Sequence, residues 1–298
     1  MIFERQKRLL ALLNTLGGEI SNLDFQKLLF LFCYQVEESP TYEFVPYKYG
    51  GFSFTSYADK RRLIEHGFLI NEERSWGLTM EGKAHAVVSP LVQSKMTSFS
   101  HHYTGLRGDK LVAKVYTHFP YHAINSEIAT RVLAGEQEKL QRIELARPKQ
   151  HEPGICTIGY EGQSLEGYLN KLIRAGVAIL CDVRKNPLSR KYGFSKNTLN
   201  KACDGVGISY VHMPGLGIVT EERRNLVTQD DYDALFAIYR RETLPKQSKA
   251  LNDIRELVVN GHYLALTCYE ASAQQCHRQC VAEELEKQFG KTFTPDQL

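Results

Sequence analysis

The residues best suited to chemistry lie near the end of the chain, where an apolar segment meets a polar loop. Residues 263–268 read Tyr-Leu-Ala-Leu-Thr-Cys, Glu270 follows, and residues 276–278 (Cys-His-Arg) open a segment with helical periodicity. A strand that ends in reactive groups, followed by a helix that points its amino terminus at them, is typical of α/β ligand sites. Glu270 is a candidate general acid or base, and the Cys268 and Cys276 thiols are candidate nucleophiles.

The elements that must position these residues alternate between short apolar segments and segments of helical periodicity. The expected strands cover residues 155–159, 177–184, 208–213 and 262–267. Such alternation implies a parallel sheet with right-handed crossovers and helices on both faces. We therefore predict an α/β fold for residues 153–298, a parallel-sheet α/β/α sandwich of the Rossmann or rhodanese type.

The loops at the carboxyl ends of parallel strands meet at one edge of the sheet. This topology gathers polar residues that are far apart in the sequence, without any further spacing rule. The residues expected at this rim are Tyr160, Glu161, Asp182, Arg184, Asn186, Ser189, Arg190, His212, Cys268, Glu270, Cys276, His277 and Arg278.

Three arginines of this rim suit an anion site. Guanidinium groups bind phosphate with paired hydrogen bonds, and Arg278 falls in the first turn of a helix. We predict that Arg184, Arg190 and Arg278 clamp a phosphate or another anion. The alternative is that Asp182 and Glu270 hold them in structural ion pairs.

Two glutamates of the rim are candidates for an acid/base pair or a metal-binding pair. Glu161 follows the first strand and Glu270 follows the fourth. We favour Glu270, because it comes directly after the end of its strand. The alternative role for Glu270 is to orient Arg184 or Arg278.

The chain has seven cysteines, an odd number. Cys33, Cys156 and Cys181 lie inside apolar segments, where thiols act as small core residues. This pattern favours a reduced, cytoplasmic protein. A zinc site from residues 276–280 with Cys268 is disfavoured, because a structural zinc site usually has paired Cys-x-x-Cys elements. We predict no metal and no cofactor.

Four ordered motifs over about residues 155–290 resemble the YeaO-like family, a bacterial and archaeal domain of unknown function. The motifs are Thr-Ile-Gly-Tyr-Glu-Gly at 157–162, Asp-Val-Arg with Asn-Pro and Ser-Arg at 182–190, Phe-Ser-Lys at 194–196, and Cys-x-Glu with Cys-His-Arg at 268–278. The resemblance implies no particular activity. The family often has Pro-Glu-Leu-Gly after the third strand, whereas residues 214–217 read Pro-Gly-Leu-Gly. If that glutamate is catalytic, this chain has lost it or supplies the group elsewhere.

The order of strand, Asp-Val-Arg, strand, Cys and Arg also broadly resembles rhodaneses and cysteine-based phosphatases. The spacing differs from that of the phosphatases. The cysteine and the arginine of a phosphatase are closer in sequence than Cys268 and Arg278, but farther apart than Cys276 and Arg278. A structural thiol and a nucleophilic thiol remain equal alternatives at both positions.

Residues 1–88 predict a helical domain that ends in a two-stranded ribbon, an α+β arrangement that resembles winged-helix domains. A third helix would carry Lys60, Arg61 and Arg62 beside Lys48, which suits contact with DNA or RNA phosphates. The alternative is a solvated helix face. Residues 47–53 (Tyr-Lys-Tyr-Gly-Gly-Phe-Ser) also resemble an element of Panacea-type antitoxin domains, which favours a protein partner.

Residues 89–152 predict a helical connector between this domain and the α/β domain. The net charge of +3 permits a basic surface without requiring one. No apolar segment is long enough to cross a membrane, and the first residues lack the pattern of a signal peptide. We therefore expect a cytoplasmic protein without membrane contact.

The leading prediction is an enzyme, a hydrolase or transferase acting on a phosphorylated ligand such as a nucleotide or nucleic acid. Glu270 would be the acid/base, and Tyr160 and His277 would orient the substrate. One alternative is a Cys-dependent sulfurtransferase or redox protein. The other is a non-enzymatic sensor or regulator that binds nucleic acid.

Overall fold

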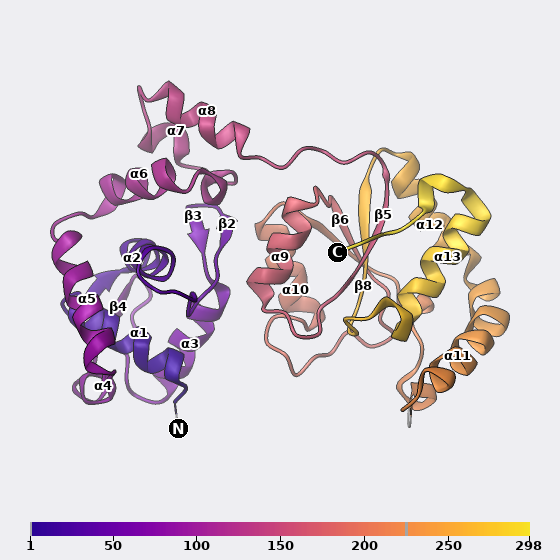
Figure 1. Cartoon of the computed structure of the whole chain (residues 1–298), viewed down its shortest axis with the longest axis horizontal. Helices are drawn as coiled ribbons and strands as arrows, with labels where there is room; N and C mark the ends of the chain where they lie inside the picture. The colour runs from indigo at the N-terminus through magenta and orange to yellow at the C-terminus, as the bar shows by residue number, and fades with distance from the viewer. Residues whose placement is uncertain (1, 224–225) are drawn as a thin grey trace. The chain divides into compact units, whose positions relative to one another are not determined.

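The computed structural model describes residues 2–223 and 226–298, and the chain forms two compact units, residues 1–147 and 148–298 (Figure 1). The first unit contains the predicted N-terminal domain together with most of the predicted connector, and the second contains the predicted α/β domain. No helix within the described ranges combines the length and the apolar character needed to span a membrane.

The first unit is mainly helical. Its helices are α1 (Glu4–Thr15), α2 (Asn22–Gln35), α3 (Phe54–Glu65), α4 (Met80–His85), α5 (Pro90–His102), α6 (Gly108–His118), η1 (Pro120–Ala123), α7 (Ala129–Val132) and α8 (Gln137–Leu145). Two of these helices begin at a serine N-cap: the Ser21 hydroxyl accepts a hydrogen bond from the Asp24 amide, and the Ser53 hydroxyl accepts one from the Ser56 amide. Helix α5 packs on α1 and α6 packs on α2, so the connector helices share this unit.

The strands of the first unit are short. They are β1 (Glu19–Ser21), β2 (Val45–Tyr47), β3 (Gly50–Phe52) and β4 (Ser75–Gly77). Strand β1 pairs antiparallel with β4, and β2 pairs antiparallel with β3. The predicted ribbon is reduced to a single antiparallel bridge between Leu69 and Leu78 beside the β1–β4 pair. The winged-helix assignment therefore stays a prediction.

The second unit is built on a five-stranded parallel sheet in the order β7-β6-β8-β5-β9. The strands are β5 (Gly154–Gly159), β6 (Ile179–Asp182), β7 (Ser209–His212), β8 (Tyr263–Cys268) and β9 (Asp296–Gln297). The predicted α/β class and the four predicted strands are confirmed. Strand β9 was not predicted, since two residues leave too short a pattern to read.

Helices cover both faces of this sheet, with α9 and α10 on one face and α12 and α13 on the other (Figure 1). The longer helices are α9 (Leu165–Arg174), α10 (Lys196–Gly205), α11 (Gln229–Ile238), α12 (Ser248–Val259) and α13 (His277–Phe289). The short turns are η2 (Pro214–Leu216), η3 (Thr220–Arg223), η4 (Tyr239–Thr243), η5 (Leu244–Gln247), η6 (Ala273–Gln275) and η7 (Lys291–Phe293).

The strand order places a topological switch point at the centre of the sheet. After β6 the chain continues outward to β7, whereas after β8 it crosses to β9 on the opposite side. The loops that follow β6 and β8 therefore leave in opposite directions and open a crevice between them. Ligands of open α/β sheets bind at such a crevice, beyond the carboxyl ends of the strands.

Candidate active site

A cavity of about 470 Å³ lies at this switch point. Its volume falls in the range of small-molecule sites, about 300–1,000 Å³. The lining residues are Tyr160, Arg184, Lys185, Asn186, Leu188, Ser189, Arg190, Ile218, Arg223, Cys268, Tyr269, Glu270 and His277. The structure thus brings together eight of the twelve predicted catalytic and phosphate-binding residues in one cavity.

Two glycines allow the loops around the cavity to approach each other. A Cβ atom on Gly159 would lie 1.8 Å from the carbonyl oxygen of Glu270, and one on Gly217 would lie 2.0 Å from the backbone nitrogen of Lys185. Real Cβ atoms do not come this close to backbone, so any other residue would push the loops apart. These are glycines of the Thr-Ile-Gly-Tyr and Pro-x-Leu-Gly segments of the sequence.

Asp182 and Arg184 form an ion pair inside the protein. The guanidinium Nε donates to Asp182 at 2.8 Å, and one NH1 group donates to the Tyr160 hydroxyl at 2.8 Å and the Phe194 carbonyl at 2.9 Å. Burial lowers the pKa of Arg184, but the hydrogen bonds and charge of Asp182 outweigh burial and raise the pKa above its usual value. This geometry favours the structural role for Arg184 over the predicted clamp.

Arg278 and Glu161 hold the loop after β8. The Arg278 guanidinium donates to the carbonyl oxygens of Glu270, at 2.5 Å, and Ala271, at 3.0 Å. The exposed Glu161 carboxylate accepts a hydrogen bond from the Ala271 amide at 2.9 Å. Neither residue lines the cavity. Both therefore contact the backbone that positions Glu270, and Arg278 does not form the predicted pair with the Glu270 carboxylate.

Besides Arg184, the lysine and arginine residues that line the cavity are Lys185, Arg190 and Arg223. Lys185 and Arg190 are exposed, and the structure gives Arg190 no ion pair with a residue in the described ranges. Arg223, in η3, forms an ion pair with Oε1 of Glu270. Sequence reasoning missed Lys185 and Arg223. Lys185 directly follows the Asp-Val-Arg motif, whereas η3 shows no periodicity that would have pointed to Arg223.

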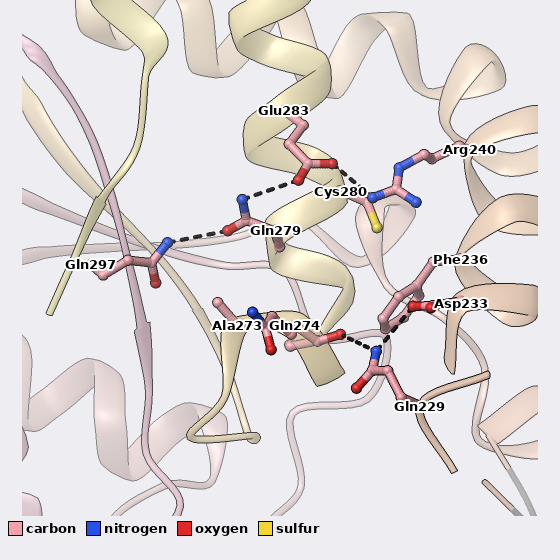
Figure 2. Close-up of a pocket in the computed structure, with 11 residues that line it drawn as sticks. Gln229, Asp233, Phe236, Arg240, Ala273, Gln274, Gln279, Cys280, Glu283 and Gln297 are labelled. Atoms are coloured by element: carbon pink, nitrogen blue, oxygen red, sulfur yellow. Dashed lines mark hydrogen bonds and ion pairs between the residues drawn. The ribbon is translucent and has the colours of Figure 1, made fainter. Parts of the chain in front are cut away.

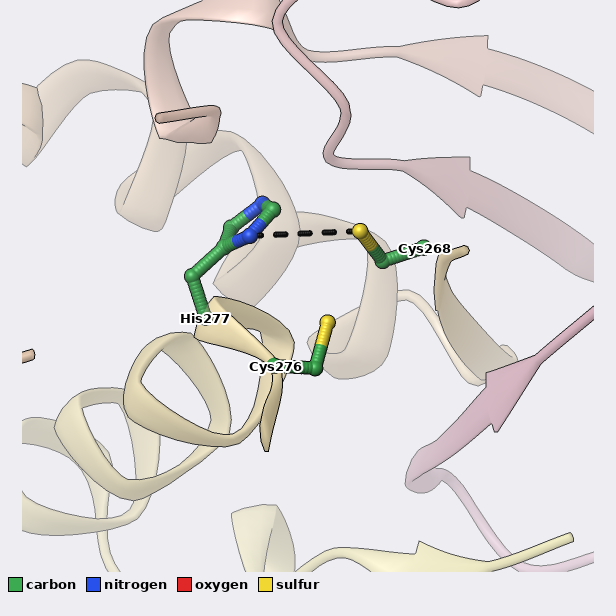
Figure 3. A group of neighbouring side chains, drawn as sticks. All are labelled: Cys268, Cys276 and His277. Atoms are coloured by element: carbon green, nitrogen blue, oxygen red, sulfur yellow. Dashed lines mark hydrogen bonds between the residues drawn. The ribbon is translucent and has the colours of Figure 1, made fainter. Parts of the chain in front are cut away.

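Glu270, Cys268 and His277 line the cavity side by side, and Figure 3 shows the Cys268 and His277 side chains pointing toward each other. The Cys268 sulfur lies 3.3 Å from Oε2 of Glu270 and 3.9 Å from Nδ1 of His277. The His277 Nε2 lies 3.0 Å from the Val183 carbonyl oxygen. Because a carbonyl only accepts, Nε2 carries a hydrogen, and Nδ1 is the ring nitrogen that faces the sulfur.

Cys268 and the neighbouring Cys276 differ in acidity. A hydrogen bond from Cys276 and the charges of Arg223 and Arg278 lower the pKa of Cys268 to about 7, although burial opposes this. Burial and the neighbouring Cys268 raise the pKa of Cys276. Because the two thiols interact, the pair loses its first proton more readily than its second.

A second cavity of about 680 Å³ lies beside α11 and α13 (Figure 2). Cys276 and Cys280 line it, together with the hydrogen-bonded series Gln297, Gln279 and Glu283. Glu283 also pairs with Arg240 at 2.7 Å. Cys276 thus borders this second cavity, while Cys268 borders the first.

The predicted nucleic-acid contacts of the first unit fall into two groups. Arg61 and Arg62 are exposed on α3, and the exposed Lys48 lies 3.6 Å from Glu127. Lys60 is buried, and its ammonium donates to Asn22 Oδ1 and to the backbone oxygens of Glu72 and Ser75. The Lys60 donors are occupied within the fold, so only the other three cations face solvent.

Comparison with known proteins gives one match. No curated protein and no solved structure matches this chain. Residues 164–285 match the profile of a family described as domain of unknown function DUF488. This segment contains α9, β6, β8 and the start of α13, and therefore most of the cavity. The chain thus contains a DUF488 domain, the family that its YeaO-like motifs indicated.

Proposed function

We propose that the DUF488 domain is an enzyme, a hydrolase or transferase, that acts on a phosphorylated substrate such as a nucleotide or nucleic acid. The observation that supports this function is the joint position of Lys185, Arg190, Arg223 and the Glu270 carboxylate around one cavity at the switch point of a parallel sheet. Cations around a concave site attract anions, and a carboxylate among them suits proton transfer.

Glu270 is the proposed general base. Its ion pair with Arg223 favours the ionised carboxylate, and only 9% of the residue is exposed, so few water molecules compete for it. Arg190 and Lys185 are the proposed phosphate contacts, in place of Arg184, whose donors are occupied, and of Arg278, which does not line the cavity. The Tyr160 ring, stacked on Phe194 at 4.3 Å, forms an aromatic wall for the substrate.

The test uses two general phosphoester probes, p-nitrophenyl phosphate and bis(p-nitrophenyl) phosphate, with the full chain. We expect Glu270→Gln to lower kcat by about 10²–10⁴-fold, as removal of a general base usually does. Glu256→Gln, an exposed position on α12, is the matched control and should keep full activity. Equal rates for the Glu270→Gln variant and the wild type would overturn the proposed role.

We further propose that the first unit is winged-helix-like and brings nucleic acid or a protein partner to the enzyme. The order of α1, β1, α2, α3 and β4, with β1 paired to β4, supports the first part. The exposed Arg61 and Arg62 on α3 support the second. Salt-dependent binding of the full chain to duplex DNA tests this contact.

A further inference from the structure

We propose that Cys268, Cys276 and His277 form a binding site for Zn²⁺. The two sulfurs and a ring nitrogen of His277 all lie within 4.8 Å of one another, and all three residues are buried (Figure 3). Cys268 ends β8, and Cys276 and His277 begin α13. The sheet and the helix therefore bring the ligands together, so that no Cys-x-x-Cys element is needed.

The ligand types and their spacing suit zinc. Two thiols and one imidazole are soft to intermediate donors, which favour Zn²⁺ over Mg²⁺ or Ca²⁺. Tetrahedral zinc with bonds of about 2.3 Å to sulfur and about 2.0 Å to nitrogen places the sulfur and nitrogen about 3.6 Å apart. The distance from Cys268 Sγ to His277 Nδ1 is 3.9 Å, so small side-chain adjustments suffice.

The contacts of His277 prepare it to bind a metal. The hydrogen bond from Nε2 to the Val183 carbonyl fixes the tautomer and leaves the Nδ1 lone pair directed at Cys268. Metal-binding histidines usually donate their other ring N–H to such an acceptor. The Val183 amide in turn donates to the Thr267 carbonyl at 3.2 Å, so the acceptor belongs to the β6–β8 region of the sheet.

The electrostatics also favour a dication. Cys276 is the N-cap residue of α13, and its side chain makes no capping hydrogen bond. A thiolate there is stabilised by the positive end of the helix. Two buried thiolates would repel each other, whereas Zn²⁺ neutralises both when their protons pass to solvent on binding.

The fourth position of a tetrahedral ion would face the 470 Å³ cavity, because Cys268 and His277 both line that cavity. A water molecule or Oε2 of Glu270, which lies 3.3 Å from the Cys268 sulfur, would fill it. Cys276 lines the 680 Å³ cavity beside α11 and α13 instead. None of the three protein ligands Cys268, Cys276 and His277 has a role in the proposed reaction.

The test is metal binding by the full chain, measured without any substrate. When the chain is freed of metal by a chelator, given Zn²⁺ and dialysed to remove the excess, we expect one Zn²⁺ per chain by elemental analysis. We also expect Co²⁺ to give a thiolate charge-transfer band and the visible bands of tetrahedral coordination. Cys268→Ser, Cys276→Ser and His277→Gln should each weaken binding at least about tenfold.

Cys280→Ser is the matched control, because Cys280 lies one helical turn after Cys276 and is not within the three-residue group. It should bind Co²⁺ as the wild type does. If a ligand variant does not fold, two measurements on the wild type replace it. Zn²⁺ should raise the Tm of the wild type and should protect Cys268 from alkylation by iodoacetamide.

Two results would overturn the zinc site. One is the absence of Co²⁺ bands and of bound Zn²⁺ in the folded wild type. The other is alkylation of Cys268 at the same rate with and without Zn²⁺, which would indicate a free reactive thiol. The Glu270→Gln variant separates this proposal from the proposed function. If it loses activity but still shows the Co²⁺ bands, both proposals hold; if it keeps activity and shows the bands, only the reaction mechanism fails.

Discussion

Asp59 in the first unit and Asp182 in the second are both buried carboxylates that hold an arginine. Asp59 accepts from Arg5 at 2.7 Å, but 41% of the Arg5 side chain remains exposed. Asp182 holds Arg184, of which only 6% is exposed, and also accepts from the Tyr210 hydroxyl. The same kind of ion pair therefore holds a partly exposed arginine, Arg5, in the first unit and a buried arginine, Arg184, at the cavity in the second unit.

The lysines of the two units differ in the same way. In the first unit Lys27 and Lys60 are buried, and their ammonium groups donate to backbone oxygens such as Gly51 O, at 3.0 Å, and Ser75 O. In the second unit Lys185 is exposed at the cavity. A cation can bind a ligand only where its donors are unoccupied, so the availability of donors separates structural from functional basic residues.

The largest expected difference concerns the two aspartates. Asp182→Ala should destabilise the second unit by about 3–5 kcal/mol, because it leaves the Arg184 charge buried without a partner. Asp59→Ala should destabilise the first unit less, by about 2–3 kcal/mol, since Arg5 can turn to water and only the buried Gln6 amide and Tyr42 hydroxyl lose their acceptor. Hydrogen exchange measured by mass spectrometry resolves the two units separately. Equal losses would show that burial of the arginine does not decide the effect.

Lys27 gives the clearest pH dependence. Burial lowers its pKa from 10.5 to about 7. Between these values the unfolded chain binds more protons than the folded one, so stability rises with pH across this window, and the full penalty is present below pH 7. Lys27→Met should therefore stabilise the first unit by roughly 2–4 kcal/mol near pH 6, with a gain that shrinks towards pH 10.

The fluorescence of Trp76 measures this effect, because Trp76 is the single tryptophan of the chain and is buried in the first unit. Urea unfolding at several pH values gives the stability of that unit directly. The loss of the hydrogen bond to Gly51 O subtracts about 1 kcal/mol at every pH. A gain in stability that does not depend on pH would contradict the lowered pKa of Lys27 in the folded state.

Gly82 in the first unit and Gly159 in the second each allow two backbone segments to approach closely, but only Gly159 contacts the loop that carries Glu270. A Cβ on Gly82 would lie 1.9 Å from the Phe68 carbonyl oxygen in the first unit, much as one on Gly159 would meet Glu270 O in the second. Both alanine variants should lose about 1–3 kcal/mol of stability. Only Gly159→Ala should also weaken binding of inorganic phosphate, measured by calorimetry, because it displaces the loop that carries Glu270. Weakened binding in the Gly82→Ala variant would remove this distinction.

The sequence predicted where polar residues gather, but not which of them have unoccupied donors. Parallel strands alone bring Asp182, Arg184 and Glu270 to one edge, so the rim was predictable from the alternation of strands and helices. The hydrogen bonds that occupy the Arg184 donors, to Asp182, Tyr160 and Phe194, depend on side-chain positions in three dimensions. The same holds for Arg223, which reaches Glu270 from an irregular segment between β7 and α11.

The smallest expected effects concern α3, where the same distinction applies to neighbouring residues. Arg61 and Arg62 are exposed, whereas the Lys60 donors are occupied by Asn22, Glu72 and Ser75. If this helix contacts DNA, Arg61→Ala with Arg62→Ala should lower the salt dependence of binding by up to about 0.9 per lost phosphate contact. Stability should change by less than about 0.5 kcal/mol, because neither arginine is buried.

Lys60→Met should do the opposite, with little change in the salt slope and a clear loss of stability, since it removes a buried ammonium from three oxygen acceptors. Fluorescence anisotropy with a labelled duplex at several salt concentrations, together with Trp76 unfolding curves, measures both quantities. A salt slope that changes with Lys60 but not with Arg61 and Arg62 would contradict the assignment of Lys60 to the scaffold.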